Sequence, residues 1–293
     1  MKQVLIISGK GGTGKTTLTA ALADLASSHL RQVLADADVD AANLELLLKP
    51  RQENRFEFRA GKTAVIDYEV CIDCGRCMEV CRFDAIRNHS GQYLIQESMC
   101  EGCASCFYQC PVDAIRMVER VSGEWYRSST EWGMLFHAAL IPGEENSGKL
   151  VTLIKDAAVE CANEEDADLL LVDGPPGIGC PVTAACRGAD AAVIVTEPTV
   201  SGVHDLERVL ETTNHFGIPA YLVINKFDLN LAMRGKLLEI AHASGVPLLG
   251  EIPYDERIMA AQSRGMPVTR ALKDGLRSQF EEIWYRLREK AKI

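Results

Sequence analysis

The sequence predicts an α/β fold built on a mostly parallel, doubly wound sheet that a small cysteine-rich module interrupts. Short, fully apolar runs alternate with segments of helical periodicity, which is typical of parallel strands covered by helices on both faces. A glycine-rich loop joins the first apolar run to the first helical segment. Eight cysteines crowd into residues 71–110, where helical periodicity is weak. We therefore expect residues 1–59 and 121–293 to form one domain, with residues 60–120 inserted into it.

The composition agrees with a soluble protein that has a full core. Of the 293 residues, 47% are hydrophobic and 25% are charged, and the formal net charge is −10. An acidic surface repels phosphate backbones, so no nucleic-acid partner is expected. No apolar run approaches the roughly 18 to 20 residues that span a bilayer. Since the first residues also lack the features of a signal peptide, we expect a cytoplasmic location.

The first elements surround the glycine-rich loop. Val4–Ser8 is a short apolar strand, Gly9–Gly14 is the loop, and Thr16–Leu30 carries apolar or small side chains at the spacing of one helical face. Gln32–Ala35 then forms a second strand that leads into Asp36. A strand before the loop and a helix after it form the context that a phosphate-binding loop requires.

Strands and helices alternate again after the cysteine-rich module. We expect the insertion to split the sheet domain in sequence and not in space. The expected strands are Gly133–Ile141, Leu169–Val172, Ala191–Val195 and Tyr221–Ile224, and the expected helices are Lys149–Ala162 and Val203–Phe216.

The loop sequence predicts a nucleotide site. Residues 9–16 read Gly-Lys-Gly-Gly-Thr-Gly-Lys-Thr and fit G-x-x-x-x-G-K-[ST]. The glycines let backbone N–H groups surround phosphates at a helix N-terminus. Lys15 can reach the β- and γ-phosphates, and the Thr16 hydroxyl can hold Mg²⁺. The expected nucleotide contacts in this loop are Gly11, Gly12, Thr13, Gly14, Lys15, Thr16 and Thr17.

The second residue of the loop, Lys10, carries a family resemblance. The run from Lys10 to Thr17 resembles the deviant Walker A motif of the MinD, ParA, Mrp and nitrogenase Fe-protein superfamily of P-loop ATPases, a branch of the SIMIBI class. The resemblance implies binding of ATP or ADP with Mg²⁺ and ATP hydrolysis. It also implies that Lys10 reaches a partner's nucleotide, in an ATP-dependent homodimer or in a heterodimer with a related ATPase.

The acidic residues after two strands complete the expected site. Asp36, Asp38 and Asp40 lie together, and mutual repulsion favours a cation or an attacking water nearby, with an exposed acidic turn as the alternative. By the resemblance, residues 36–40 form the family's switch I segment, and Asp38 acts with Lys10 and Lys15 in catalysis as the residue that orients or activates water. The resemblance also assigns Mg²⁺ to Thr16, Asp36 and Asp173, and the base to Asn225, Pro253 and Asp255.

The cysteines form two runs with the spacing of bacterial two-cluster ferredoxins. In each run three cysteines two residues apart are followed, after three more residues, by a fourth that ligates the other [4Fe–4S] cluster. Two zinc sites are the alternative. The expected ligands are Cys71, Cys74, Cys77 and Cys110 for the first cluster, and Cys100, Cys103, Cys106 and Cys81 for the second. The segments 70–86 and 99–115 therefore look like two copies of one unit.

Cys161, Cys180 and Cys186 lie outside these runs. Cys180 follows Asp173 at a spacing that resembles the cluster cysteine of the nitrogenase Fe protein, but a second such cysteine has no clear counterpart. We expect these residues to be small buried thiols.

The combination resembles MinD-superfamily ATPases that contain an inserted, small α+β, bacterial-ferredoxin-like module. We expect an ATPase in which the nucleotide state gates electron transfer through two [4Fe–4S] clusters to a redox or Fe–S partner protein. Two alternatives are an Fe–S assembly or carrier ATPase of the Mrp type, and a MinD- or ParA-like spatial organiser with redox-sensing clusters. The last alternative needs attachment to a membrane or to DNA. A membrane would be bound through the amphipathic residues 276–293, although such a helix more often docks on its own domain.

Overall fold

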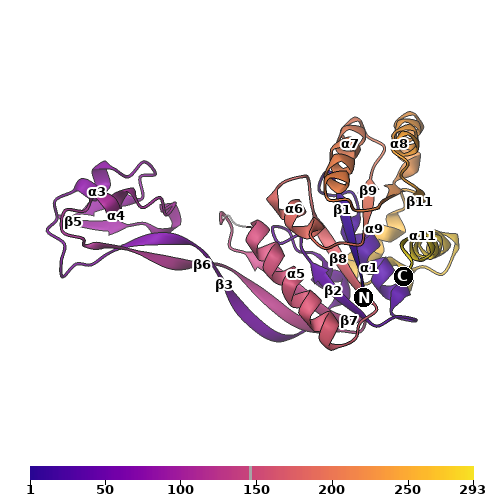
Figure 1. The fold of residues 1–293 in the computed structure, drawn as a ribbon, viewed down its shortest axis with the longest axis horizontal. Helices are drawn as coiled ribbons and strands as arrows, with labels where there is room; N and C mark the ends of the chain where they lie inside the picture. The colour runs from indigo at the N-terminus through magenta and orange to yellow at the C-terminus, as the bar shows by residue number, and fades with distance from the viewer. Residues whose placement is uncertain (145–146) are drawn as a thin grey trace. The chain divides into compact units, whose positions relative to one another are not determined.

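The protein divides into two compact units in a computed structural model that describes residues 1–144 and 147–293. The larger unit comprises Met1–Phe56, Trp125–Leu140 and Ser147–Ile293. The smaller unit comprises Glu57–Glu124 and the short segment that begins at Ile141. Figure 1 labels the elements of both units. The smaller unit contains the whole of the cysteine-rich segment.

The larger unit is built on a twisted, mostly parallel sheet. Among the described residues, its strands lie in the order β11-β10-β9-β1-β8-β2-β7-β6-β3. The central strand β1 pairs in parallel with β8 and β9, and β2 pairs in parallel with β7 and β8. The strands are β1 (Lys2–Ser8), β2 (Gln32–Asp36), β3 (Arg51–Ile66), β6 (Ile115–Thr130), β7 (Gly133–Leu140), β8 (Leu169–Pro176), β9 (Ala191–Thr196), β10 (Ala220–Asn225) and β11 (Leu248–Ile252). Strands from both sides of the insertion therefore alternate in one sheet, as expected.

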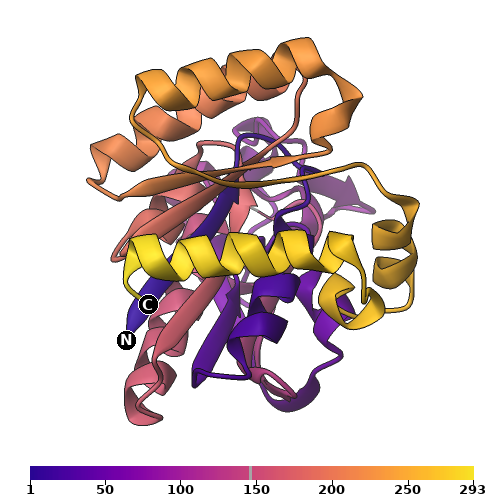
Figure 2. The same cartoon turned by 90° about the vertical axis from the view of Figure 1, so that its right-hand side faces the viewer.

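Helices cover both faces of this sheet (Figures 1 and 2). Side chains of alternate residues point to opposite faces, so Val4 and Ile6 pack in one buried cluster with the helices α1 and α11. In Figure 2, α11 runs across this face. The helices of the larger unit are α1 (Lys15–Ala26), α2 (Leu44–Leu48), α5 (Ser147–Glu164), α6 (Cys180–Cys186), α7 (Val200–His215), α8 (Leu231–Ala243), α9 (Glu256–Ser263), α10 (Val268–Ala271) and α11 (Gly275–Ala291), with a 3₁₀ turn η2 (Phe227–Leu229).

The predicted strands and helices agree with the structure to within a few residues, whereas several observed elements, among them β6, β11 and α8, were not predicted. Helix α1 ends at Ala26 rather than Leu30, because the Ser27 and Ser28 hydroxyls donate to the carbonyls of Asp24 and Leu25 and compete with further helix. The strand β3 was not predicted. Its first residues are exposed on both sides, so they lack the apolar alternation that marks a half-buried strand.

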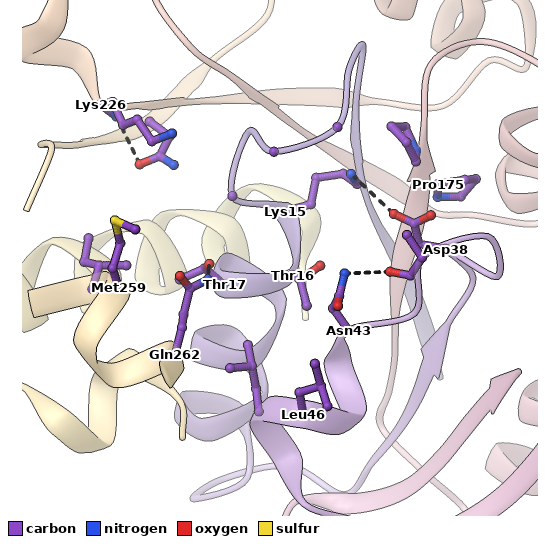
Figure 3. Close-up of a pocket in the computed structure, with 18 of the residues that line it drawn as sticks. Lys15, Thr16, Thr17, Asp38, Asn43, Leu46, Pro175, Lys226, Met259 and Gln262 are labelled. Carbon is purple, nitrogen blue, oxygen red and sulfur yellow. Dashed lines mark hydrogen bonds and ion pairs between the residues drawn. The ribbon is translucent and has the colours of Figure 1, made fainter. Parts of the chain in front are cut away.

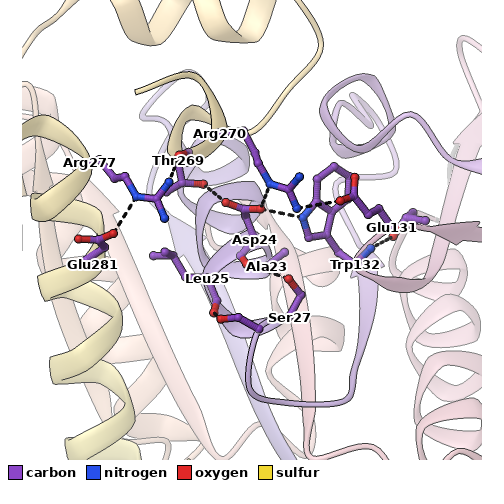
Figure 4. Close-up of polar contacts among 12 residues, drawn as sticks. Ala23, Asp24, Leu25, Ser27, Glu131, Trp132, Thr269, Arg270, Arg277 and Glu281 are labelled. Atoms are coloured by element: carbon purple, nitrogen blue, oxygen red, sulfur yellow. Dashed lines mark hydrogen bonds and ion pairs between the residues drawn. The ribbon is translucent and has the colours of Figure 1, made fainter. Parts of the chain in front are cut away.

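A polar network around Asp24 joins three elements of the larger unit (Figure 4). The Asp24 carboxylate, on α1, accepts hydrogen bonds from the Trp132 indole at 3.0 Å and the Thr269 hydroxyl at 2.6 Å, and it pairs with Arg270. Burial raises the pKa of Asp24, but these hydrogen bonds outweigh burial and lower the pKa below its ordinary value. The network ties α1 to the turn between β6 and β7 and to α10.

The C-terminal helix α11 docks on its own sheet. Asp274 caps it by accepting the N–H of Leu276 at 3.2 Å. The apolar side chains of residues 276–293 lie in the buried core, so this helix docks on its own domain, which was the favoured of the two expectations, and does not present that face to a membrane. Among the described residues, no helix is long and apolar enough to cross a bilayer. The buried side chains are Leu276, Phe280, Ile283, Trp284 and Leu287.

The smaller unit has little apolar core. It contains α3 (Arg76–Glu79), a hairpin of β4 (Ile86–His89) and β5 (Gln92–Ile95), a 3₁₀ turn η1 (Glu97–Met99), α4 (Ser105–Gln109) and parts of β3 and β6. The hairpin turns at Ser90 and Gly91, both at positive φ, as a two-residue turn requires. Five of the eight cysteines of the two runs pack against a cluster of buried side chains in this unit. The cluster itself contains a sixth, Cys106, together with Ala64, Ile66, Ile86 and Ile115.

The two cysteine runs share one backbone conformation. Residues 29 positions apart adopt the same left-handed conformation: Asp73 (φ 53°) and Gly102 (φ 64°), Gly75 (φ 79°) and Ala104 (φ 61°), and Asp84 (φ 51°) and Asp113 (φ 54°). A short helix begins one residue after the second pair in each run. The repeat predicted from the sequence is therefore present in the backbone.

Candidate functional site

A cavity of about 660 Å³ lies beside the glycine-rich loop, at the carboxyl ends of the parallel strands (Figure 3). This edge is where open α/β sheets bind ligands. Most of the residues expected to contact nucleotide line the cavity, and Asp40 joins them. Those expected residues are Gly11, Gly12, Gly14, Lys15, Thr16, Thr17, Asp38, Asn225, Pro253 and Asp255.

The glycine-rich loop has the backbone of a phosphate cradle. Gly12 (φ 78°) and Gly14 (φ 94°) are left-handed, and Gly14 is the N-cap of α1. A Cβ at Gly14 would lie 2.4 Å from the amide nitrogen of Asn225, so only glycine fits there. The free N–H groups and dipole of α1 therefore face the cavity, where they suit an anion.

Asn225 joins the glycine-rich loop to the end of β10. Its side-chain amide donates to the carbonyl of Thr13 at 2.8 Å, which connects the end of β10 to the loop. Pro253 and Asp255, the other expected base contacts, follow β11. The Tyr254 N–H donates to Asp228 at 2.8 Å, so the two loops expected to contact the base are bonded to each other.

Lys15 and Asp38 meet inside the cavity. The Lys15 Nζ lies 3.9 Å from Asp38 Oδ2, and only 4% of the Lys15 side chain is exposed. Burial raises the pKa of Asp38 to about 6, although the charge of Lys15 opposes this, and Asp173 and Asp40 add to it. An oxygen of this carboxylate can accept a proton or a hydrogen bond from water within the cavity.

Asp36 holds the polypeptide that follows β2. Its Oδ2 accepts the N–H groups of Asn43 and Leu44, at 3.1 and 3.0 Å, and its Oδ1 accepts that of Asp38 at 3.1 Å. Burial, and then the charge of Asp173, raise the pKa of Asp36. Asp36 therefore fixes the switch I segment, residues 36–40, and the start of α2.

Asp173 has the surroundings of a cation ligand. It is fully buried at the carboxyl half of β8, where its Oδ1 accepts the Thr19 hydroxyl at 2.9 Å and its Oδ2 has no hydrogen-bond partner. Burial raises its pKa, against the effects of Thr16, Lys15 and Thr19. A buried carboxylate oxygen without a partner is costly, and Mg²⁺ with its bound water would satisfy it. The residues present therefore fit Mg²⁺ beside the phosphates.

Lys10 lies outside the lining of the cavity and is held within its own chain. Its Nζ lies 3.5 Å from Glu197 Oε2, 3.3 Å from the Thr199 hydroxyl and 3.4 Å from the Ser201 hydroxyl. The other Glu197 oxygen lies 2.5 Å from the Nζ of Lys226. One carboxylate thus pairs with two lysines.

Sequence reasoning missed several residues of this site. Glu197 and Thr199 follow β9 at the same edge of the sheet, and their position after a buried strand was a usable signal. Gln262 of α9 donates to the Thr17 hydroxyl, and apolar side chains from α2 and α9 line the cavity, but no local pattern brings these elements together. The apolar residues are Leu46, Leu47, Ile258 and Met259.

The smaller unit contains two further cavities, each lined by four cysteines. Each cavity takes three cysteines from one run and the fourth from the other. Apart from the thiols, the linings are largely apolar, with Ile66 and Ile115 in one and Ile86 and Met117 in the other. The sets are Cys71, Cys74, Cys77 and Cys110, and Cys81, Cys100, Cys103 and Cys106. Each cavity is thus lined by one of the two sets of four cysteines that the spacing predicts.

The cysteine thiols differ in pKa. Burial, and then the charge of Cys100 among other neighbours, raise the pKa of Cys106 to about 11. Burial also raises the pKa of Cys77, whereas a hydrogen bond with Ser105 lowers that of Cys103.

Within residues 1–144 and 147–293, no three His, Cys, Asp or Glu side chains are close enough to hold one metal ion.

The other three cysteines divide by exposure. Cys161 and Cys186 are buried, as expected. Cys180, expected to be buried, is exposed at the first residue of α6, so that expectation was wrong. Its neighbour Pro181 lines the nucleotide cavity.

Comparisons with known proteins agree with the fold and the loop. Residues 4–268 match the family described as the CobQ/CobB/MinD/ParA nucleotide binding domain. An uncharacterized protein of Methanocaldococcus jannaschii is 39% identical over 78% of this chain and 79% of its own length. A putative septum site-determining protein MinD of Mesostigma viride is 26% identical over 91% of this chain and 76% of its own length.

Solved structures share the fold. The MinD protein of Pyrococcus horikoshii, complexed with Mg-ADP, has a TM-score of 0.60 and 18% identity, and the match covers 99% of this chain and 97% of that one. MinD of Aquifex aeolicus has a TM-score of 0.58 and 22% identity, over 99% and 97% of the two chains. Together with the cradle around Lys15, the family match over most of the sequence shows that this chain belongs to the CobQ/CobB/MinD/ParA nucleotide-binding family, as one of its P-loop ATPases.

Proposed function

We propose that this protein is a Mg²⁺-dependent ATPase in which the nucleotide state gates electron transfer through two [4Fe–4S] clusters in the smaller unit. One observation carries the cluster assignment: two cavities each gather four cysteines, with the fourth exchanged between the runs. This exchange is the ligation that the ferredoxin spacing predicts. When bound, such clusters would accept and release single electrons.

The residues of the larger unit have separate tasks in hydrolysis. Lys15 and the N–H groups of the loop bind the phosphates, and Thr16 and Asp173 would hold Mg²⁺, which would neutralise charge on the phosphates. Asp38 orients the attacking water and accepts its hydrogen bond. Lys10 leaves Glu197 and reaches the nucleotide of a second subunit, in a homodimer or in a heterodimer with a related ATPase.

Metal analysis tests the cluster assignment. Protein purified without oxygen is expected to contain iron and sulfide and to give the EPR signal of reduced [4Fe–4S] clusters. Cys110→Ser should remove the first cluster and Cys81→Ser the second, although each residue lies in the opposite run. Zinc without sulfide would disprove the assignment, as would loss of the second cluster on Cys110→Ser.

Nucleotide gating is tested separately on intact protein. The rate at which dithionite reduces the clusters is expected to differ between Mg-ATP and Mg-ADP. Lys15→Ala, which removes the phosphate contact, should abolish that difference while iron content stays unchanged. Equal rates with both nucleotides would leave the clusters in place and eliminate the gating proposal.

A MinD-like spatial organiser is the second candidate, and the comparisons favour it over electron transfer. Several similar proteins carry the name septum site-determining protein, which describes the choice of a site and not the movement of electrons. Such a protein needs a surface to bind, and the apolar face of α11 is already buried. ATP-dependent sedimentation with liposomes would support this candidate, and its absence in the presence of Mg-ATP would count against it.

A further inference from the structure

A chain of hydrogen bonds, buried at His137 and Ser128 and partly exposed at Glu45, connects α2 to the β6–β7 hairpin. His137, on β7, places its Nδ1 2.9 Å from Glu45 Oε2, in the first turn of α2. Its Nε2 lies 3.0 Å from the hydroxyl of Ser128, on β6. Ser128 is 0% exposed and His137 is 5% exposed. All three side chains belong to the larger unit.

The order Ser, His and Glu is that of a hydrolase triad, but this serine cannot act as a nucleophile. A triad serine must meet a substrate carbonyl, and the Ser128 side chain is fully buried. The ring of Tyr126 also stacks on that of His137, with the centroids 5.0 Å apart. Ser128, His137 and Glu45 therefore hold β6, β7 and α2 together.

The hydrogen bonds have a defined direction. Burial lowers the pKa of His137, although Glu45 opposes the shift, so the ring is neutral at neutral pH and has one donor and one acceptor. Only Nδ1 faces a carboxylate, so Nδ1–H donates to Glu45 and Nε2 accepts the Ser128 hydroxyl. The chain runs from β6 through β7 to α2.

Helix α2 is in turn bonded to the switch I segment. Asp36 accepts the N–H of Leu44, the first residue of α2, at 3.0 Å. Val39 accepts the N–H of Leu140, at the end of β7, at 3.4 Å. The segment that carries Asp38 is thus fastened both to α2 and to β7. A displacement of α2 relative to β7 must move Asp38.

We propose that Glu45 and His137 are positioning residues for ATP hydrolysis, which keep the switch I segment in register with β7 and couple its nucleotide-dependent state to the β6–β7 hairpin. This inference depends on the ATPase activity and is independent of the clusters. The coupling to β6 concerns both units, because this strand begins at Ile115 in the smaller unit and ends in the larger one.

Two substitutions of one residue separate the two contacts. The side-chain amide nitrogen of asparagine takes the position of Nδ1, and that of glutamine takes the position of Nε2. His137→Asn therefore keeps the contact with Glu45. His137→Gln loses that contact and keeps one with Ser128, whose hydroxyl then accepts from the amide nitrogen instead of donating. Glu45→Ala removes the same contact from the other side, and Glu282→Ala is the control, since it removes a surface carboxylate paired with Arg286 on α11.

The expected kinetic result is a split between kcat and KM. Glu45→Ala and His137→Gln should lower kcat about ten-fold through misplacement of Asp38, with KM for ATP changed less than about two-fold. His137→Asn should retain kcat, and the double variant Glu45→Ala/His137→Gln should be no slower than either single variant. The proposal fails if His137→Asn is as slow as His137→Gln, or if Glu45→Ala is no slower than Glu282→Ala.

Hydrogen exchange provides a readout that does not require turnover. Exchange of the amides around Ser128 is expected to differ between a non-hydrolysable ATP analogue and ADP in the native protein and in His137→Asn. That difference should disappear in Glu45→Ala and His137→Gln. An identical difference in all four proteins overturns the coupling. Iron and sulfide content, measured on the same samples, should be equal in all, which separates this result from the cluster proposal.

Discussion

At the scale of single residues, the nucleotide cavity depends on a few buried charges that lie close together. Lys15 and Asp38 are largely buried, and Asp36 and Asp173 are completely buried. Burial raises the pKa of both Asp36 and Asp173, and the charge of Asp173 raises that of Asp36 further. A site arranged in this way favours a cation and binds phosphate through the lysine.

Asp38→Asn tests the assignment of the water-orienting residue. The amide preserves the shape of the side chain but cannot accept a proton, so kcat for ATP hydrolysis should fall at least about 100-fold. Affinity for ATP should change by only a few-fold, because the loop and Lys15 remain intact. Phosphate release and nucleotide titration measure the two quantities. Activity close to that of the native protein would remove Asp38 from catalysis.

At the scale of elements, Asp24 connects α1, α10 and the β6–β7 turn. Asp24→Asn should lower the free energy of unfolding by about 1 to 3 kcal/mol at neutral pH, because a hydrogen-bonded charge is lost. The folded pKa lies below the ordinary value of 3.8. The stabilisation of the fold by the ionised Asp24 is therefore complete above about pH 3.8 and is lost as the pH falls through the folded pKa.

Urea unfolding at several pH values measures this effect. The difference in stability between the native protein and Asp24→Asn should narrow below about pH 4. Asp156→Asn, which affects an exposed pair with Arg187, is the control and should change stability by less than about 1 kcal/mol. A difference that stays constant with pH would show that the charge of Asp24 is not what stabilises the fold.

The docking of α11 gives a second prediction at this scale. Phe280 is 1% exposed, whereas Tyr285 on the same helix is 65% exposed. Phe280→Ala should cost about 3 to 5 kcal/mol of unfolding free energy through a core cavity. Tyr285→Ala should cost less than about 0.5 kcal/mol. Equal effects in denaturant titrations would mean that α11 contributes little to the core.

Prediction from sequence worked for elements that carry a local pattern. The glycine loop, the buried strands and the cysteine spacing all lie within short windows, so their fold and the shared backbone of the two runs could be foreseen. The strand β3 lacks such a pattern because its first residues are exposed on both faces. The contacts of Lys10 with Glu197 and of Glu45 with His137 join residues far apart in the chain. Only the folded sheet brings them together.

At the scale of the whole molecule, the two units rely on different sources of stability. The larger unit has an extensive apolar core around α1 and α11, whereas the smaller one buries only a few side chains that pack against its cysteines. If iron holds those cysteines, the free energy of metal binding is part of the folding free energy of the smaller unit.

Calorimetry should therefore resolve two transitions. Removal of iron by a chelator without oxygen should abolish the transition of the smaller unit and leave nucleotide binding intact. Mg-ADP at about 100 times its Kd should stabilise the larger unit by about 2.7 kcal/mol. A single transition that responds to both treatments would contradict this separation.

Glu197 has a consequence for how two subunits would first meet. If Lys10 turned toward a neighbouring subunit, the Glu197 carboxylate would still have a counter-charge, because the ammonium of Lys226 lies 2.5 Å from its other oxygen. If Glu197 paired with Lys10 alone, the departure of Lys10 would leave an unpaired carboxylate, and the free-energy cost of that charge would oppose the exchange far more strongly. Lys10 could therefore exchange the Glu197 carboxylate for a phosphate of the neighbouring nucleotide at low electrostatic cost. It could return as readily after the triphosphate has been hydrolysed.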